Sequence, residues 1–341
     1  MVSEQHPFDP GREDELDRAF RPKSLGDFVG QERLKDNLRI AIDAARSRGE
    51  APEHMLFSGP PGLGKTSLAS IISQEMGTQL HLASGPALER KKDLVGILTQ
   101  LQHRDVLFID EIHRIPIPVA ESLYTAMEDF ALAFTLDEGP NARVLNMALK
   151  RFTLIGATTR RGLLPGPFLA RFGHTFQLDY YAPEELVAIL ERSARLTGAA
   201  FAREALELLA SRARGTPRIA NRFLRRARDL AQALYASAPV DGRIASETLE
   251  RLGVDDAGLE ETDRRILRAL AQNDARPKGL RTLSALVGEE PDTIELVYEP
   301  FLLREGLIDR TPQGRVITRR GYGAIGERPP TPSSLFGELE T

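Results

Sequence analysis

A glycine-rich segment that begins at Gly59 carries the clearest chemistry in the chain. It reads GPPGLGKT and fits the pattern G-x-x-x-x-G-K-[ST] at every fixed position. Gly62 and Gly64 allow backbone N–H groups to close around phosphate oxygens, and a following helix adds the positive end of its dipole. Lys65 is predicted to reach the β- and γ-phosphates, and the Thr66 hydroxyl to ligate Mg²⁺. The segment therefore predicts a nucleoside triphosphate site with Mg²⁺.

Two adjacent carboxylates follow the apolar run 106–109. A buried strand of an open α/β sheet delivers the residues at its carboxyl end to the ligand site. Asp110 is predicted to hold Mg²⁺ through water, and Glu111 to polarise the water that attacks the γ-phosphate. Alone, the pair would also suit an acidic loop, but together with the glycine-rich segment it predicts hydrolysis of a nucleoside triphosphate.

A third apolar run, 152–156, ends in the polar residues Thr158, Thr159 and Arg160. A hydroxyl at this point can orient the water between the γ-phosphate and Glu111. We favour Thr159 over Thr158 for this role. Threonine at a strand end also serves simply as a turn former, so the sequence leaves the choice open.

These motifs require a sheet that brings several strand ends to one edge. The apolar runs 54–58, 105–109 and 152–156 are predicted as parallel strands that are buried on both faces. Helical spacing lies between them, for example over 67–76. The alternation predicts a doubly wound α/β domain over residues 19–182.

The pattern becomes purely helical after Pro183, where the proline and the following acidic residues suit a helix start. Residues 183–253 are predicted as a small helical domain, and 253–258 as a hinge. The polar ends of the chain, 1–18 and 329–341, are predicted as a flexible arm and a flexible tail.

The remaining segment, 258–328, is predicted as a winged-helix domain. Three helical segments come first, over 263–272, 279–287 and 292–305. A β-hairpin across 307–318 follows them. Three helices and a hairpin are the order of a winged helix, a variant of the helix-turn-helix.

Composition excludes several classes of protein. The chain has no cysteine, which excludes disulfides and Cys-ligated zinc and suits the cytoplasm. No apolar run reaches about 18 residues, so no membrane span is predicted. A formal net charge of −4 means that DNA binding would need a local basic patch. Residues 310–320, with four arginines and no acidic residue, provide one.

Taken in order, the motifs resemble those of the RuvB family of AAA+ ATPases. The matching strings are RPKSLGDFVGQ (21–31), the glycine-rich segment, DEIHR (110–114), GATTR (156–160), ARFG (170–173) and GTPRIANR (215–222). The resemblance runs from about residue 20 to 320. It implies an AAA+ ATPase domain, a helical lid and a winged-helix head.

This resemblance also implies a function. Members of the family form homo-hexameric rings that use ATP to drive branch migration of Holliday junctions. They act with RuvA, with RuvC in the resolvasome, and on the duplex DNA arms of the junction. The implied context is DNA recombination and repair, including the SOS response.

Two arginines gain roles from the resemblance. Arg171 corresponds to the arginine finger that one subunit donates to the ATP of its neighbour. Such a cation offsets charge on the transferring phosphoryl group and is worth roughly 10³–10⁵ in rate. Arg218 resembles the second sensor arginine, which contacts the γ-phosphate within its own subunit.

Further residues are implied to bind the nucleotide. Phe20, Arg21 and Tyr181 resemble residues that line the adenine pocket, and Ser67 keeps a hydroxyl where the family often has threonine. The string Glu128-Asp129-Phe130 resembles a family segment near the nucleotide at the subunit boundary.

Arg310 and Arg315 flank the wing turn and resemble the family's DNA contacts. A four-way junction has no fixed sequence, so phosphate contacts suit it better than base readout. A third basic contact of the family falls near position 291, where this chain has Pro291. Basic neighbours that could compensate are Arg281, Arg319 and Arg320.

An inserted hairpin is predicted over 131–149, with its turn at 138–141. In the family the corresponding hairpin contacts RuvA through apolar side chains. The candidates here are Val144, Leu145, Met147 and Leu149. A hairpin packed only on its own domain is an equally open alternative.

Two rival functions remain at this point. The first is another AAA+ role, such as a clamp-loader subunit or a replication initiator. The second is a winged-helix transcription regulator with a nucleotide-sensing domain. The GATTR string and the wing favour the motor, and the helical collar that usually ends a clamp loader is absent from the pattern.

Overall fold

The computed structural model describes residues 19–135, 144–272 and 276–329, which form two compact units. The first unit contains the described residues up to Gly198 together with Gly215–Asn221. The second contains Ala199–Arg214 and the described residues from Arg222 onward. The predicted arm, the tail beyond residue 329 and the hairpin turn at 138–141 lie outside the described residues.

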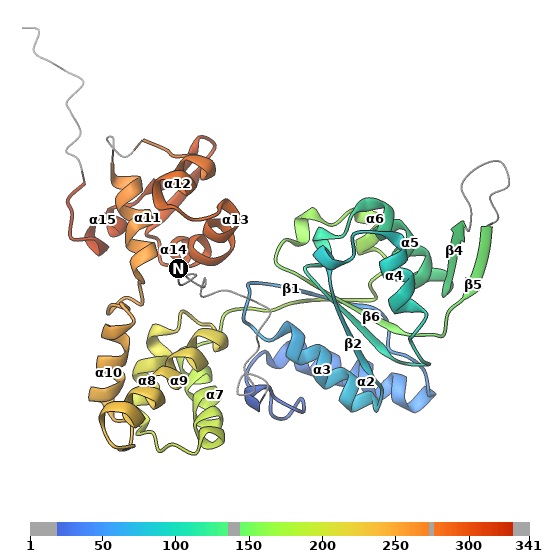
Figure 1. Ribbon diagram of the computed structural model, residues 1–341, viewed down its shortest axis with the longest axis horizontal. Helices are drawn as coiled ribbons and strands as arrows, with labels where there is room; N and C mark the ends of the chain where they lie inside the picture. The colour runs from blue at the N-terminus through green and yellow to red at the C-terminus, as the bar shows by residue number, and fades with distance from the viewer. Residues whose placement is uncertain (1–18, 136–143, 273–275, 330–341) are drawn as a thin grey trace, which may run out of the picture. The chain divides into compact units, whose positions relative to one another are not determined.

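A five-stranded sheet forms the centre of the first unit, in the order β2-β3-β6-β1-β7 (Figure 1). Every neighbouring pair is parallel. Its strands are β1 (Met55–Ser58), β2 (Leu80–Ser84), β3 (Val106–Asp110), β6 (Thr153–Thr158) and β7 (His174–Gln177). Strands β1, β3 and β6 are buried along their lengths except at Asp110. The three predicted strands and the doubly wound α/β class are confirmed.

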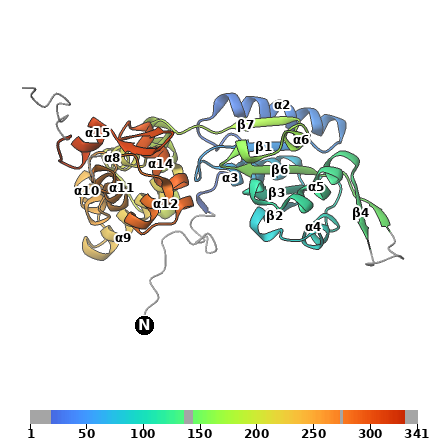
Figure 2. The same ribbon diagram turned by 90° about the horizontal axis from the view of Figure 1, so that it is seen from above.

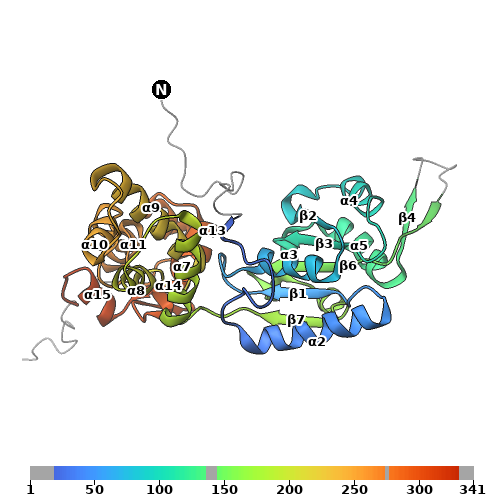
Figure 3. The ribbon, with the colours of Figure 1, turned by 90° about the horizontal axis from the view of Figure 1, so that it is seen from below.

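Helices cover both faces of this sheet. Figure 1 shows α2 (Glu32–Arg48) and α3 (Lys65–Met76) on one face, which Figure 3 shows from below. The other face carries α4 (Lys91–Leu98), α5 (Ile117–Asp129) and α6 (Gly166–Leu169). The last helix of the unit is α7 (Pro183–Thr197), which starts at the predicted proline.

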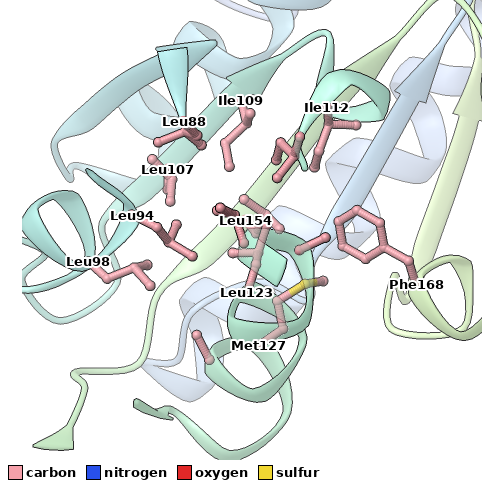
Figure 4. Packing of buried hydrophobic residues seen from close by; sticks show 14 of the residues in the cluster. Leu88, Leu94, Leu98, Leu107, Ile109, Ile112, Leu123, Met127, Leu154 and Phe168 are labelled. Atoms are coloured by element: carbon pink, nitrogen blue, oxygen red, sulfur yellow. The ribbon is translucent and has the colours of Figure 1, made fainter. Parts of the chain in front are cut away.

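Leucines dominate the core between the sheet and this second face (Figure 4). Leu107 and Leu154 of the strands meet Leu94 of α4 and Leu123 of α5, and all four are fully buried. Burying apolar surface stabilises the unit by roughly 25 cal/mol for each Å² removed from water. The packing fixes β3 and β6 side by side, and with them the residues at their ends.

The predicted hairpin is also present. It consists of β4 (Ala131–Thr135) and β5 (Val144–Ala148), which pair antiparallel. It projects from the end of the sheet at which β6 begins (Figure 2). Leu132 at its base is buried in the core of the unit.

The second unit begins with α8 (Arg203–Arg212), most of α9 (Pro217–Leu234) and α10 (Gly242–Arg251). The winged-helix segment follows with α11 (Glu261–Ala271), α12 (Leu280–Val287), α13 (Pro291–Thr293) and α14 (Glu299–Arg304). The wing is formed by β8 (Ile308–Thr311) and β9 (Gly314–Ile317). Three helices followed by a hairpin are thus confirmed, and the structure adds α15 (Arg319–Ala324).

The third predicted helix of this segment is interrupted. Residues Ile294–Tyr298 form a π-helical turn between α13 and α14. Pro300 explains it, because a proline inside a helix has no N–H to donate and its ring crowds the preceding turn. Glu299 directly follows this turn, and its side chain is buried.

Hydrogen bonds cross the segment predicted as a hinge. The guanidinium of Arg264 donates to the carbonyl of Gly253 at 2.8 Å, to the carbonyl of Leu259 at 3.0 Å and to the carboxylate of Asp255 at 3.0 Å. These bonds join the end of α10 to the start of α11 within one unit. Within the described ranges, no helix has the length and apolarity required to cross a membrane.

Candidate active site

Sheet order brings the three predicted motifs together. Strand β6 lies between β3 and β1. All three run parallel, so their carboxyl ends reach the same edge of the sheet, which is where open α/β sheets bind ligands. The glycine-rich segment follows β1, Asp110 ends β3, and Thr158 ends β6 (Figure 2).

The glycines of the segment form a cradle that a side chain would fill. Gly62 and Gly64 have φ values of 80° and 103°, which L-residues rarely adopt. A Cβ atom on Gly62 would lie 2.8 Å from the methyl group of Thr216 and 3.0 Å from Cβ of Arg218. On Gly64 it would lie 3.0 Å from the ring of Phe28. This geometry fits a phosphate-binding loop, and it places Arg218 against the loop.

Lys65 is the first residue of α3 and is only 8% exposed. Its ammonium donates hydrogen bonds to the carbonyls of Gly59 at 2.8 Å and Pro60 at 2.7 Å. The pKa of Lys65 is lowered to about 8, chiefly by burial and also by Arg218, while Asp110 and Glu111 act in the opposite direction. No carboxylate of a described residue pairs with it, so a triphosphate fits the site as the missing counter-charge. Thr66 and Ser67 follow in the first turn of α3 and are half-buried.

Asp110 and Glu111 take different orientations at the end of β3. One carboxylate oxygen of Asp110 accepts a hydrogen bond from the backbone N–H of Glu111 at 2.9 Å. Glu111 has a left-handed backbone with φ of 47°. Non-glycine residues in this conformation store strain and cluster at functional sites. Carboxylate and hydroxyl oxygens are the ligands that Mg²⁺ prefers, so Asp110 and Thr66 fit the predicted metal.

Thr158, the last residue of β6, and Thr159, which follows it, differ in their partners. The Thr158 hydroxyl accepts a hydrogen bond from the backbone N–H of Arg160 at 3.0 Å and lies 3.0 Å from Nδ1 of His113. The hydroxyl of Thr159 is buried without a hydrogen-bond partner among the described residues. A buried hydroxyl without a partner is costly, so a water or ligand is expected to satisfy it. This difference supports Thr159 as the water-orienting residue.

His113 was not among the predicted site residues, although it lies in the DEIHR string. Burial lowers the pKa of His113, and the nearby Arg160 and Arg114 lower it further, so its imidazole is neutral at pH 7. Nδ1 of a neutral imidazole can accept the hydrogen bond that the Thr158 hydroxyl donates. The contact links the loop after β3 to the end of β6.

Tyr181 packs directly on the glycine-rich segment. Its hydroxyl donates a hydrogen bond to the carbonyl of Leu63 at 3.2 Å. Burial raises the pKa of Tyr181, and Glu185 raises it further, so the hydroxyl remains a donor. The segment Phe20–Arg21 is anchored by Arg192 of α7, which donates to both backbone carbonyls at 2.7 and 3.0 Å. No motif in the sequence points to Arg192, because this side chain contacts only backbone groups that are distant in the chain.

Arg171 and the Glu128-Asp129-Phe130 string lie at the opposite edge of the sheet. Phe130 contacts the rings of His54 and Phe152, which precede β1 and β6. Arg171 precedes β7 and pairs with Glu128 at 2.8 Å. Strands of four to six residues separate the two edges by roughly 13–20 Å at about 3.3 Å per residue. Within one chain, therefore, Arg171 and the glycine-rich segment are not brought together.

The wing arginines share one buried partner. Arg310 and Arg315 both donate hydrogen bonds to Glu299, which is almost completely buried. Burial opposes the ionisation of Glu299, but the hydrogen bonds and charges of the two arginines outweigh it and lower the pKa. The side chain of Arg310 stays 51% exposed, whereas that of Arg315 is only 14% exposed. Arg310 is therefore the better placed of the two for a phosphate.

Two further predictions concern surfaces. Of the four hairpin candidates, Met147 and Leu149 pack partly against the core of their own unit. The side chains of Val144 and Leu145 lie outside the described residues. Pro291 starts α13, with the acidic Asp292 next to it.

Comparison with known proteins agrees with this architecture. The family model for the Holliday junction DNA helicase RuvB P-loop domain matches residues 20–178. Models for the RuvB AAA lid domain and the RuvB C-terminal winged helix domain match residues 181–255 and 256–326.

Individual proteins are similar over nearly the whole chain. The Holliday junction branch migration complex subunit RuvB of Rubrobacter xylanophilus is 52% identical over 325 residues, which cover 95% of this chain and 91% of that protein. The protein of the same name from Myxococcus xanthus is 52% identical, with 94% of each chain covered. The solved structure of the Thermotoga maritima RuvB Holliday junction branch migration motor superimposes with a TM-score of 0.83 at 44% identity, and covers 91% of this chain and 99% of that one. With its P-loop, lid and winged-helix regions all matched, the chain belongs to the RuvB family.

Proposed function

We propose that this chain hydrolyses ATP at the contacts between its copies in a homo-hexameric ring and thereby drives branch migration of Holliday junctions. The ring acts in the cytoplasm with RuvA, with RuvC in the resolvasome, and on the duplex arms of the junction. The names of its relatives support the junction as substrate. The separation of Arg171 from the glycine-rich segment supports the shared site.

Each residue of the carboxyl edge has a place in this proposal. Gly62 and Gly64 leave room for phosphate oxygens, and Lys65 supplies the buried positive charge that they need. Thr66 and Asp110 would hold Mg²⁺, which would offset negative charge on the phosphates. Glu111 takes the proton of the attacking water, and the unsatisfied hydroxyl of Thr159 orients that water.

The second sensor and the adenine pocket come from the same unit. Arg218 lies against Gly62 and close enough to Lys65 to lower its pKa, so it faces the bound phosphates. Tyr181, hydrogen-bonded to the backbone of the glycine-rich segment, and the anchored Phe20–Arg21 segment line the pocket for the base.

Arg171 completes the site from the neighbouring subunit. A separation of roughly 13–20 Å between the two edges of the sheet supports a role for Arg171 at the ATP of a neighbouring chain rather than at its own. In a ring built from heterologous contacts, the amino edge of one subunit can face the carboxyl edge of the next. Glu128, Asp129 and Phe130 would then border the neighbour's nucleotide.

A complementation experiment tests the shared site. Lys65→Ala removes the phosphate contact but keeps the finger, and Arg171→Ala does the reverse. Each homogeneous ring is expected to be inactive in ATP hydrolysis. A one-to-one mixture is expected to regain activity, because about a quarter of the contacts in a random ring pair an intact cradle with an intact finger. A mixture as inactive as its components would contradict the proposal.

The substrate is tested separately. ATP-dependent dissociation of a synthetic four-way junction is measured with and without a RuvA partner. We expect dissociation that needs ATP, increases with RuvA and does not depend on the base sequence of the arms. A sharp sequence preference would instead indicate a regulator that reads bases.

A further inference from the structure

The guanidinium of Arg171 is held at three points within its own chain. Its central carbon lies 5.3 Å from the centroid of the Tyr124 ring, above the ring face. Nη2 donates to the carboxylate of Glu128 at 2.8 Å, and Nη1 donates to the carbonyl of Pro167. Nε has no hydrogen-bond partner among the described residues. The side chain is thus oriented although its hydrogen-bonding capacity is only partly used.

Tyr124 is the rigid member of this arrangement. It belongs to α5, and its ring lies 4.6 Å from that of Phe168 in α6, which in turn lies 5.2 Å from the ring of Phe172 (Figure 1 shows the two helices side by side). Tyr124 packs against the buried core of the first unit. The ring therefore cannot move freely, whereas the carboxylate that holds the other side of Arg171 is exposed.

The three contacts differ in what happens when a phosphate approaches. The side chain of Glu128 is 61% exposed and that of Arg171 is 28% exposed, so water screens their ion pair and makes it weak. A triphosphate can displace this carboxylate from the edge of the guanidinium. The Tyr124 ring binds the face instead, and a guanidinium can stack on a ring while its edge binds a phosphate.

We propose that Tyr124 is a positioning residue for the arginine finger. It holds the guanidinium of Arg171 at the amino edge of the sheet, so that the finger meets the neighbouring subunit's triphosphate already oriented. Less rotamer freedom is then lost when the finger engages, and this raises the rate of the chemical step. The inference rests on the proposed function, because it requires a finger that acts between subunits.

The test compares Tyr124→Leu with Tyr124→Phe. Leucine keeps apolar packing against Phe168 but removes the ring face, whereas phenylalanine keeps the face. We expect Tyr124→Leu to lower kcat about three- to thirtyfold, which is the range of a cation–π contact converted to a rate. The Kd for ATP should not change, because the cradle lies at the other edge. Tyr124→Phe should remain within about twofold of the wild type, since phenylalanine also binds cations.

Rings assembled from two kinds of mutant subunit distinguish a loss of Arg171 positioning from a general effect of Tyr124→Leu on folding. Lys65→Ala subunits contribute only fingers, and Arg171→Ala subunits contribute only cradles. Tyr124→Leu is placed either on the finger-donating or on the cradle-donating subunit, so that the two mixtures have the same mutations overall. We expect loss of activity only in the first mixture. Equal loss of activity in both mixtures would reveal a general structural effect of the substitution. No loss in either mixture would show that the aromatic ring of Tyr124 is dispensable. Either result would overturn the inference.

Homogeneous rings give a second test of the inference that does not require mixing of subunits. Tyr124→Leu is combined with Arg171→Ala, and the residual ATPase rate is compared with that of Arg171→Ala alone. If Tyr124 acts through Arg171, no further loss is expected. An equal loss with and without Arg171 contradicts the role of Tyr124. An Arg171→Ala ring with wild-type activity would instead contradict the proposed function itself.

Discussion

Lys65 makes the affinity for ATP depend on pH in a predictable direction. Burial lowers the pKa of its ammonium to about 8 in the free protein. Lys65 is therefore about nine-tenths protonated at pH 7 and about one-tenth protonated at pH 9. The phosphates of ATP favour the charged form, so binding raises this pKa. Because the complex binds more protons than the free protein, affinity falls as the pH rises above 8.

The size of the effect follows from these fractions. Affinity should fall about tenfold between pH 7 and pH 9, and binding at pH 9 should take up about 0.9 proton. The other two site residues with shifted pKa values do not interfere. The pKa of His113 is lowered from 6.5, so His113 is already neutral, and that of Tyr181 is raised from 10, so Tyr181 stays protonated.

Isothermal titration calorimetry measures both quantities. A non-hydrolysable ATP analogue with Mg²⁺ is titrated at pH 7, 8 and 9, in pairs of buffers with different ionisation enthalpies. Lys65→Arg is the control, since its guanidinium stays charged throughout this range and should show neither the loss of affinity nor the proton uptake. Equal affinity of the wild type at pH 7 and pH 9 would refute the reasoning, as would the same uptake in Lys65→Arg.

Three further predictions come from single contacts. Thr159→Val should reduce ATP hydrolysis at least about tenfold without lowering Tm, because it removes a hydroxyl that has no hydrogen-bond partner among the described residues. Thr158→Val should lower Tm, because the hydroxyl of Thr158 is hydrogen-bonded. The opposite pattern would exchange the roles of the two threonines. Gly62→Ala should destabilise the fold by about 1–3 kcal/mol and weaken ATP binding, because the new methyl group would sit at a positive φ and clash with Thr216. The control is Gly96→Ala in α4, where the methyl group would meet open space, so neither Tm nor ATP affinity should fall. Glu299→Gln should lower Tm yet tighten duplex DNA binding, because the wing arginines lose their counter-charge. The slope of the logarithm of the binding constant against the logarithm of the salt concentration should steepen by about one unit. An unchanged slope would argue against phosphate contacts at the wing.

Local patterns in the chain predicted the fold class correctly, and they selected strand-end residues that the structure brings to one edge of the sheet. In residues 54–58, 105–109 and 152–156, apolar side chains fall on both faces of the strand, and burial on both faces suits this pattern. Their order with the intervening helices is enough to indicate a doubly wound sheet. The π-helical turn before Pro300 and the single-residue pairing of Lys278 with Arg315 escaped prediction, because neither produces a periodic pattern.

The types and spacing of residues such as Gly62, Lys65 and Asp110 already predict phosphate and metal chemistry, because that chemistry depends on consecutive backbone groups and on side chains at strand ends. Which partners these residues meet depends on segments far apart in the chain. The low pKa of Lys65, the bonded state of Thr158 and the neutralised wing arginines result from burial and from charges of distant residues. The placement of Arg171 at the edge opposite Lys65 likewise follows from the direction of β7 in the folded sheet. Desolvation and Coulomb interactions act through space, so these properties arise only when the chain is folded.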